Sequence, residues 1–134
     1  MRYLVILILL CSCSDEYVFN VESELSGYVE SFFELSKQHG KNLDKNNLTV
    51  RFSKEIGSLH GVYIDRSGLN IIEINYYHYQ NYSRDYMEAI VFHELGHAIL
   101  KRQHDDSVES LMNTSLCLMC YSENKSYFIN ELFK

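Results

Sequence analysis

Proline is missing from this 134-residue chain, and lysine and arginine are outnumbered by aspartate and glutamate, 12 to 18. The lack of proline excludes a proline-rich linker, and the sequence also has no internal repeat and no low-complexity tract. The formal net charge of −6 argues against nucleic acid as a partner, because surfaces that bind nucleic acid are rich in positive charge. A chain of this length builds one domain around a single core.

Hydrophobic runs long enough to span a bilayer are lacking as well. The apolar run at residues 3–10 follows a basic Arg2 and is too short for a transmembrane helix, so it is typical of an export signal. Segment 10–13, LCSC, resembles a bacterial lipobox, and this resemblance implies cleavage before Cys13 and attachment of lipid to that cysteine. An ordinary secretory signal cleaved nearby is the alternative.

These features divide the chain into a lipoprotein signal peptide at residues 1–12, a lipidated tether at 13–23 and a folded domain at 24–134. Several acyl chains on Cys13 would hold the protein on a membrane without a transmembrane helix. The expected location is the bacterial cell envelope, as an outer membrane lipoprotein that is periplasmic or surface-exposed. The acidic residues directly after Cys13 resemble the surface-export signals of some Gram-negative lipoproteins.

Cysteine is scarce beyond the signal. Apart from Cys13, the expected mature chain has only Cys117 and Cys120. In a compartment that permits oxidation we expect a local disulfide or two packed thiols. Redox catalysis would need a helix amino terminus after a strand, and a second zinc site would need another nearby pair of cysteines or histidines. Neither pattern is present around this pair.

Residues 93–97 read HELGH, the sequence form of a helical zinc site that activates water. Residues four apart lie above one another on an α-helix, so His93 and His97 can bind one metal ion while Glu94 lies beside it. Zinc held in this way lowers the pKa of its bound water from about 15.7 to roughly 7, and a nearby carboxylate can take the proton. The motif predicts a catalytic Zn²⁺ site with Glu94 as general base. A chance pair of solvated histidines is the alternative.

The surrounding sequence predicts a helix from about residue 84 to 101. Ser83 offers a hydroxyl cap, Asp85 lies in the first turn, and basic residues 101–102 lie at the carboxyl end, where the helix dipole favours them. The side away from the two histidines is apolar, with Glu88 as the one polar exception. The apolar residues on that side are Val91, Phe92, Leu95, Ala98 and Ile99.

A third zinc ligand is expected after this helix. His104 is the first choice, because a turn just past the helix end could bring its ring back to the metal. Asp105 or Asp106 could coordinate instead, since a carboxylate oxygen is an acceptable zinc ligand. A glutamate on a later helix would give a thermolysin-like arrangement, and Glu123 is the best-spaced candidate for it.

Residues 84–113 resemble the metzincin family of zinc peptidases, through the HELGH motif, His104 and the segment 110–113, SLMN. The usual family pattern places glycine at position 100 and histidine at position 103, where this chain has Leu100 and Gln103, with His104 one residue later. The resemblance implies His93, His97 and His104 as zinc ligands. It also implies a turn beneath the metal that carries Met112. For Met112 alone, ordinary core packing is the alternative.

The remaining pattern predicts an α+β fold, a small mixed β-sheet packed on the active-site helix. Apolar residues at helical spacing predict an amphipathic helix near residues 24–39, which Gly40 ends. Alternation predicts strands at 48–52, 61–64 and 71–75, and a closing helix is expected at 124–133. In metzincin-like folds the edge strand before the active helix lines the substrate cleft, and 71–75 holds that place in the order of elements.

The tyrosine-rich segment 76–82 and three further histidines are expected to have structural roles. The tyrosine-rich segment 76–82 is expected to be an exposed amphipathic loop, with substrate contact as the alternative. His39, His60 and His78 have no ligand spacing and are assigned no role in metal binding.

The sequence therefore predicts a membrane-anchored zinc metalloendopeptidase with a peptide or protein substrate and Zn²⁺ as its cofactor. Two other hypotheses stay open at this stage. A lipoprotein could keep a peptidase-like fold as a binding or assembly module that zinc only stabilises, or it could be a structural lipoprotein that needs no metal.

Overall fold

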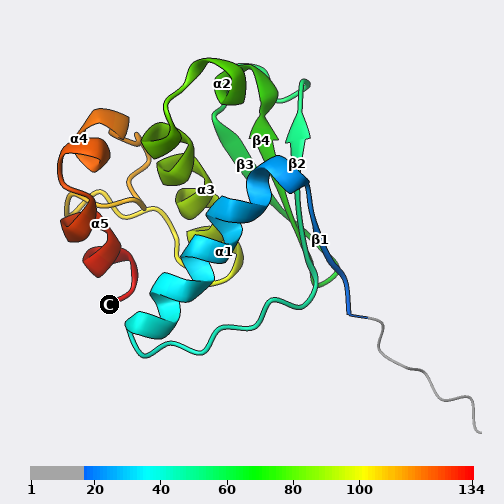
Figure 1. The fold of residues 1–134 in the computed structure, drawn as a ribbon, viewed down its shortest axis with the longest axis horizontal. Helices are drawn as coiled ribbons and strands as arrows, with labels where there is room; N and C mark the ends of the chain where they lie inside the picture. The colour runs from blue at the N-terminus through cyan, green and yellow to red at the C-terminus, as the bar shows by residue number, and fades with distance from the viewer. Residues whose placement is uncertain (1–16) are drawn as a thin grey trace, which may run out of the picture.

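The computed structural model describes residues 17–134, so the predicted signal peptide and the lipidation site at Cys13 lie outside the described residues. Within the described part of the chain, no helix combines the length and the apolar character that a membrane crossing would need. Its elements, in chain order, are β1 (Phe19–Val21), α1 (Ser23–Gln38), β2 (Leu48–Ser53), β3 (Gly61–Arg66), β4 (Leu69–Asn75), α2 (Tyr76–Asn81), α3 (Arg84–Ala98), α4 (Leu118–Glu123) and α5 (Lys125–Leu132) (Figure 1).

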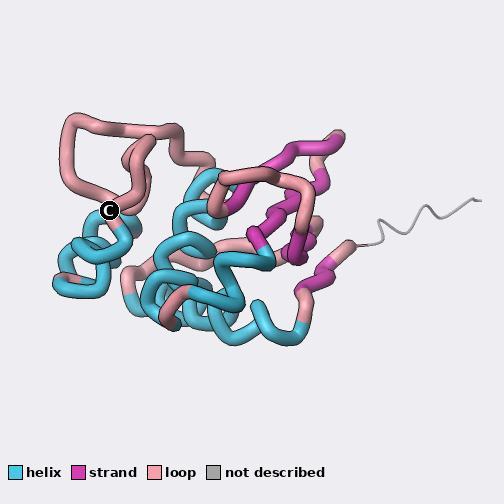
Figure 2. The backbone as a smooth tube through the Cα atoms, turned by 90° about the horizontal axis from the view of Figure 1, so that it is seen from above, coloured by secondary structure: helices cyan, strands magenta, loops and turns pink. Residues whose placement is uncertain are grey.

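The four strands form one mixed sheet in the order β1-β2-β4-β3. β1 and β2 are parallel, as are β2 and β4, whereas β3 runs antiparallel to β4 with Tyr63 opposite Ile72. Figures 1 and 2 show the sheet at one side of the molecule and α4 and α5 at the other, with α3 between them. The predicted α+β class, with a small mixed sheet packed on the helix that carries the HELGH motif, is confirmed.

The edge of the sheet near that motif is β3, so the prediction that residues 71–75 form the edge strand was wrong. Ser67 and Gly68 both have positive φ, 52° and 86°, which is the conformation of a type I′ hairpin turn. This tight turn folds β3 back against β4, whose other side already pairs with β2. Of the two strands of this hairpin, β3 comes first in the sequence and therefore lies at the edge of the sheet.

Helix α3 lies at the centre of the fold, with 10 of its 15 residues buried. Its amino end is capped as predicted, since the Ser83 hydroxyl oxygen accepts a hydrogen bond from the Tyr86 N–H at 3.3 Å. Glu88, the polar exception, accepts hydrogen bonds from the Tyr121 hydroxyl at 2.6 Å and the Lys125 ammonium at 2.8 Å. This buried carboxylate ties α3 to α4 and α5, and burial, together with the hydrogen bond to Glu88, raises the pKa of the Tyr121 hydroxyl.

Three other boundaries differ from the sequence-based expectation. Strand β1 lies inside the segment 13–23 that was assigned to a tether, because its backbone pairs with β2. Residues 76–81 form helix α2 and not a loop, since the Asn75 side chain caps it by accepting from the Tyr77 N–H at 3.0 Å. Helix α4 was not predicted, and it carries a Cys117–Cys120 disulfide, which is one of the two expected states of that pair.

Candidate metal centre and active site

Three histidine rings converge beside α3. The Nε2 atoms of His93 and His97 lie 3.2 Å apart, and the Nε2 atom of His104 lies 3.3 Å from the first and 3.1 Å from the second. His93 and His97 are one turn apart on α3, as the motif requires. Among the described residues these three histidines form the one group of potential ligands close enough to hold a single metal ion.

His104 reaches the helix residues because the chain reverses directly after α3. Lys101 has a φ of 55°, the left-handed conformation that glycine adopts more easily. The next residue, Arg102, then donates its N–H to the Gly96 carbonyl at 3.1 Å, which holds the returning chain against the helix. Lys101 thus makes the turn for which the metzincin pattern has a glycine.

Backbone carbonyls orient two of the rings. The Nδ1–H of His97 donates to the Arg102 carbonyl at 2.7 Å, and the Nδ1–H of His93 donates to the Leu111 carbonyl. Because a carbonyl can only accept, both protons must be on Nδ1, and in the neutral rings both Nε2 atoms carry lone pairs. The unprotonated Nε2 atoms of His93 and His97 therefore lie close enough to bind one metal ion.

This donor set fits a divalent cation. Two bare ring nitrogens repel each other at 3.2 Å, whereas in a tetrahedral zinc site with Zn–N bonds of about 2.0–2.1 Å two ligand nitrogens lie roughly 3.3–3.4 Å apart. Burial lowers the pKa of His93 to about 4, and it lowers the pKa of His97 as well. Both rings are therefore neutral near pH 7, which is the state that binds a metal.

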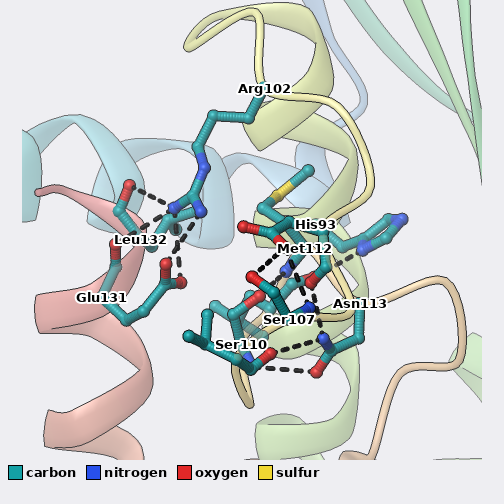
Figure 3. A network of polar contacts seen from close by, with 11 residues as sticks. His93, Arg102, Ser107, Ser110, Met112, Asn113, Glu131 and Leu132 are labelled. Atoms are coloured by element: carbon teal, nitrogen blue, oxygen red, sulfur yellow. Dashed lines mark hydrogen bonds and ion pairs between the residues drawn. The ribbon is translucent and has the colours of Figure 1, made fainter.

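The turn at residues 110–113 supports His93 from below. The Ser110 hydroxyl accepts from the Met112 N–H at 3.0 Å, and the Asn113 side-chain oxygen accepts from the Ser110 N–H at 2.8 Å (Figure 3). This turn presents the Leu111 carbonyl to His93. The Met112 side chain is fully buried, with its sulfur packed against Gly96 on α3. Residues 110–113 were predicted to form a methionine-bearing turn, and this turn lies next to His93, a candidate ligand.

Glu94 lines a cavity of about 420 Å³ together with the three histidines. Its side chain is only 5% exposed, and burial raises its pKa to about 7. Gly61, the first residue of β3, makes room for it, because a Cβ at that position would lie 2.9 Å from the Glu94 Cγ. A carboxyl group with a pKa near 7 can both accept and return a proton at neutral pH.

The other candidate ligands lie outside this cluster. The Asp105 carboxylate accepts hydrogen bonds from the backbone and hydroxyl of Ser107, and the Asp106 carboxylate accepts from the backbone and hydroxyl of Thr114. Both aspartates thereby shape the loop that carries His104. Glu123 ends helix α4 and is not one of the clustered residues.

Arg102 connects this site to the end of the chain. Its guanidinium donates to the Glu131 carboxylate at 2.8 Å and to the backbone carbonyls of Glu131 and Leu132 at 3.0 and 3.2 Å (Figure 3). The same residue supplies the carbonyl that orients His97. The ion pair between Arg102 and Glu131 therefore fixes the position of a group that holds a candidate ligand.

Two histidines that the sequence left without a role lie at or near the site. His60 lines the cavity together with His93 and Glu94, and its Nδ1 lies 3.1 Å from the Nδ1 of His78. The sequence gives no sign of this contact, because the two residues are 18 positions apart, His60 in the loop before β3 and His78 in α2. His39, by contrast, contacts Asn130 away from the cavity.

A mixed sheet with an antiparallel edge strand, packed on a helix whose HELGH motif faces a cavity, defines a zincin-like domain. Comparison with known families agrees with this class. A family model described as the SprT-like family matches residues 29–123, so the chain belongs to the SprT-like family, which is part of the zincin-like metallopeptidase superfamily and is associated with zinc. Neither the curated proteins nor the solved structures gave a match.

Proposed function

We propose that this protein is a zinc-dependent metallopeptidase that hydrolyses peptide bonds inside a polypeptide. The observation that carries the proposal is the convergence of three histidine Nε2 atoms, 3.1–3.3 Å apart, next to a buried glutamate in one cavity. Membership of a zincin-like family supports it. His93, His97 and His104 would hold the ion through Nε2.

The proposed reaction uses Glu94 as the proton carrier. When bound, zinc supplies Lewis-acid polarisation of the substrate carbonyl and a water of lowered pKa. Glu94 accepts a proton from the attacking water and returns it to the nitrogen of the leaving amine. The position of Glu94 suits this role, because its side chain lines the same cavity as the three candidate ligands.

Substrate would bind along the β3 edge of the cavity. Gly61, Val62 and Tyr63 of β3 line the same cavity as the three candidate ligands. In the described part of the chain, β3 is paired on one side only, so an extended peptide can add to its free side by backbone hydrogen bonds. We therefore propose an extended peptide or an unfolded protein segment as the substrate.

Two finer assignments belong to this proposal. A metzincin-like site is supported by the position of His104 and by the turn that packs Met112 under α3. Membrane anchoring through lipid on Cys13, with a location in the bacterial cell envelope, rests on the resemblance of residues 10–13 to a lipobox. A Cys13→Ser variant should lose incorporation of labelled palmitate and leave the membrane fraction, whereas unchanged labelling would refute the anchor.

The peptidase proposal is tested with a broad peptide library and purified full-length protein. We expect cleavage that a chelator abolishes and added zinc restores, and a Glu94→Gln variant that keeps about one zinc per chain but does not cleave. Cleavage by the variant at the wild-type rate would refute the role of Glu94. A wild-type protein that binds zinc and cleaves no peptide would refute the peptidase proposal and favour a binding or assembly module that zinc only stabilises.

A further inference from the structure

His60 lies in the same cavity as the proposed reaction centre, and the proposed mechanism does not use it. It directly precedes β3, and the next residue, Gly61, contacts the Glu94 side chain. Its ring lines the cavity that contains the three candidate ligands.

The backbone around His60 is held in place by one residue. The Asn75 N–H donates to the His60 carbonyl at 3.0 Å, and the Asn75 side-chain amide donates to the carbonyls of Leu59 at 2.9 Å and Gly57 at 3.0 Å. Asn75 is itself the cap of α2. The loop before β3 is therefore fastened to the end of β4 and the start of α2.

The ring of His60 is held by His78 on α2. The two Nδ1 atoms lie 3.1 Å apart, and the His78 ring stacks on Tyr82, with the ring planes 3° apart and the centroids separated by 4.6 Å. His78 is only 8% exposed, so its ring has little freedom to turn. A buried and stacked imidazole thus fixes the direction of the more accessible imidazole in the cavity.

One proton lies between the two Nδ1 atoms, because two lone pairs at 3.1 Å would repel each other. When His78 supplies that proton, the neutral His60 ring carries its own proton on Nε2 and can donate it to another molecule. Among the described residues neither Nε2 has a hydrogen-bond partner, and neither is fully shielded from solvent. In that tautomer the Nε2–H of His60 is an available donor to a molecule bound in the cavity.

We propose that the Nε2–H of His60 binds the carbonyl oxygen of the peptide bond that is cleaved, and that His78 is the positioning residue that keeps this donor in place. This inference rests on the proposed peptidase function. The hydrogen bond strengthens as negative charge develops on that oxygen during water attack, so it favours the transition state over the bound substrate.

The test compares four single variants of the zinc-loaded full-length chain. His60→Ala should lower kcat by about 100-fold with little change in KM, as the loss of one such donor does in other hydrolases. His60→Gln should recover part of this loss through its amide N–H. His78→Phe keeps an aromatic ring for Tyr82 to stack on but removes the Nδ1 contact, and it should lower kcat by about tenfold. His39→Gln, at a histidine away from the cavity, should match the wild type.

A second measurement does not depend on turnover. A phosphonamidate peptide carries an anionic tetrahedral group in place of the cleaved bond, and His60→Ala should weaken its binding by about 100-fold while the uncleaved substrate, measured in the Glu94→Gln background, binds about equally. A His60→Ala protein with wild-type kcat, or an equal loss of affinity for both ligands, would overturn the role of His60. If His78→Phe lowers only the melting temperature, His78 has no positioning role.

Failure of the underlying function gives a different result. In that case the wild type itself neither cleaves peptides nor distinguishes the phosphonamidate from the substrate, and the inference about His60 falls with it. If the wild type shows cleavage that depends on Glu94 and the His60 variants do not differ from it, the peptidase proposal stands and only the inference is overturned.

Discussion

The sulfur atom of Met112 packs against the bare Cα of Gly96 so closely that a methyl group at residue 96 would overlap it. Gly96 lies within the HELGH motif, between His93 and His97, while Leu111, next to Met112, supplies the carbonyl that orients His93. One contact on the inner side of α3 thus sets the distance between the helix and the turn that supports a candidate zinc ligand.

Gly96→Ala should destabilise the protein by about 1–3 kcal/mol, because the added methyl group forces Met112 and its turn away from the helix. Zinc affinity should fall as well, since the Leu111 carbonyl moves with the turn. Urea unfolding and competition with a chromophoric chelator measure the two effects. Gly27→Ala in α1 is the matched control, because a Cβ there meets nothing within 4 Å and should stabilise the helix by about 0.5–1 kcal/mol. Equal stability of the two variants would contradict the packing argument.

Gly61→Ala tests the space that β3 leaves for Glu94. The new methyl group would lie 2.9 Å from the Glu94 Cγ and 3.0 Å from Oε1, so the carboxylate must shift. We expect at least a tenfold loss of kcat, on the order of what small misplacements of a reacting group cause, with about one zinc per chain retained. Steady-state kinetics and metal analysis on the same sample measure both. A variant that loses zinc and keeps its fold would place the effect of Gly61 on the ligands and not on Glu94.

Glu131→Gln tests the link between the last helix and His97. We expect a loss of about 2–3 kcal/mol in stability, less than for a fully buried pair because the Arg102 side chain is 25% exposed. Zinc affinity should fall by about tenfold, since Arg102 supplies the carbonyl that orients His97. The control is Glu34→Gln, which removes the exposed ion pair with Lys37 and should leave both stability and zinc affinity nearly unchanged. Unchanged zinc affinity in Glu131→Gln would show that the ion pair between Arg102 and Glu131 does not help to position His97.

The raised pKa of Glu94 makes the stability of the zinc-free protein depend on pH in a defined direction. Because burial moves the pKa from 4.5 to about 7, the folded state binds the proton more tightly, and the stability from protonated Glu94 is lost as pH rises through 7. The pKa of His93, lowered from 6.5 to about 4, acts in the opposite direction, with stability rising from pH 4 to 6.5.

A comparison of wild type with Glu94→Gln isolates the glutamate, since the histidine contribution is common to both proteins. In zinc-free samples the variant should gain up to about 3 kcal/mol of stability relative to wild type between pH 4.5 and 8. Urea unfolding at four or five pH values in the presence of chelator measures the difference. A constant difference across this range would mean that the pKa of Glu94 is not raised.

Local rules were enough to predict the helix that carries the motif. The serine cap at Ser83 and the spacing of His93 and His97 act within a few residues of one another, so the sequence reveals them directly. His104 could be ranked first among the candidates for the third ligand, but its position could not be predicted. That position depends on the left-handed conformation of Lys101, and lysine seldom adopts this conformation.

Other features depend on contacts between distant elements. The order of the strands is set by pairing, and only the hairpin turn at Ser67 and Gly68 gave a local sign that β3 folds back on β4. Asn75 is a residue type that favours a helix cap and so indicated α2, but the tyrosine-rich composition of residues 76–82 favoured a loop. The contact between His60 and His78 left no sign in the sequence, since neither residue has ligand spacing.

An anomalous-scattering map at the zinc absorption edge, recorded from crystals grown with zinc, shows whether His93, His97 and His104 hold one zinc ion. We expect a single strong peak per chain at about 2.0–2.1 Å from the Nε2 atom of each ring, beside the Glu94 carboxylate. Three rings in their present arrangement with no peak between them, or a peak bound by other residues, would contradict it.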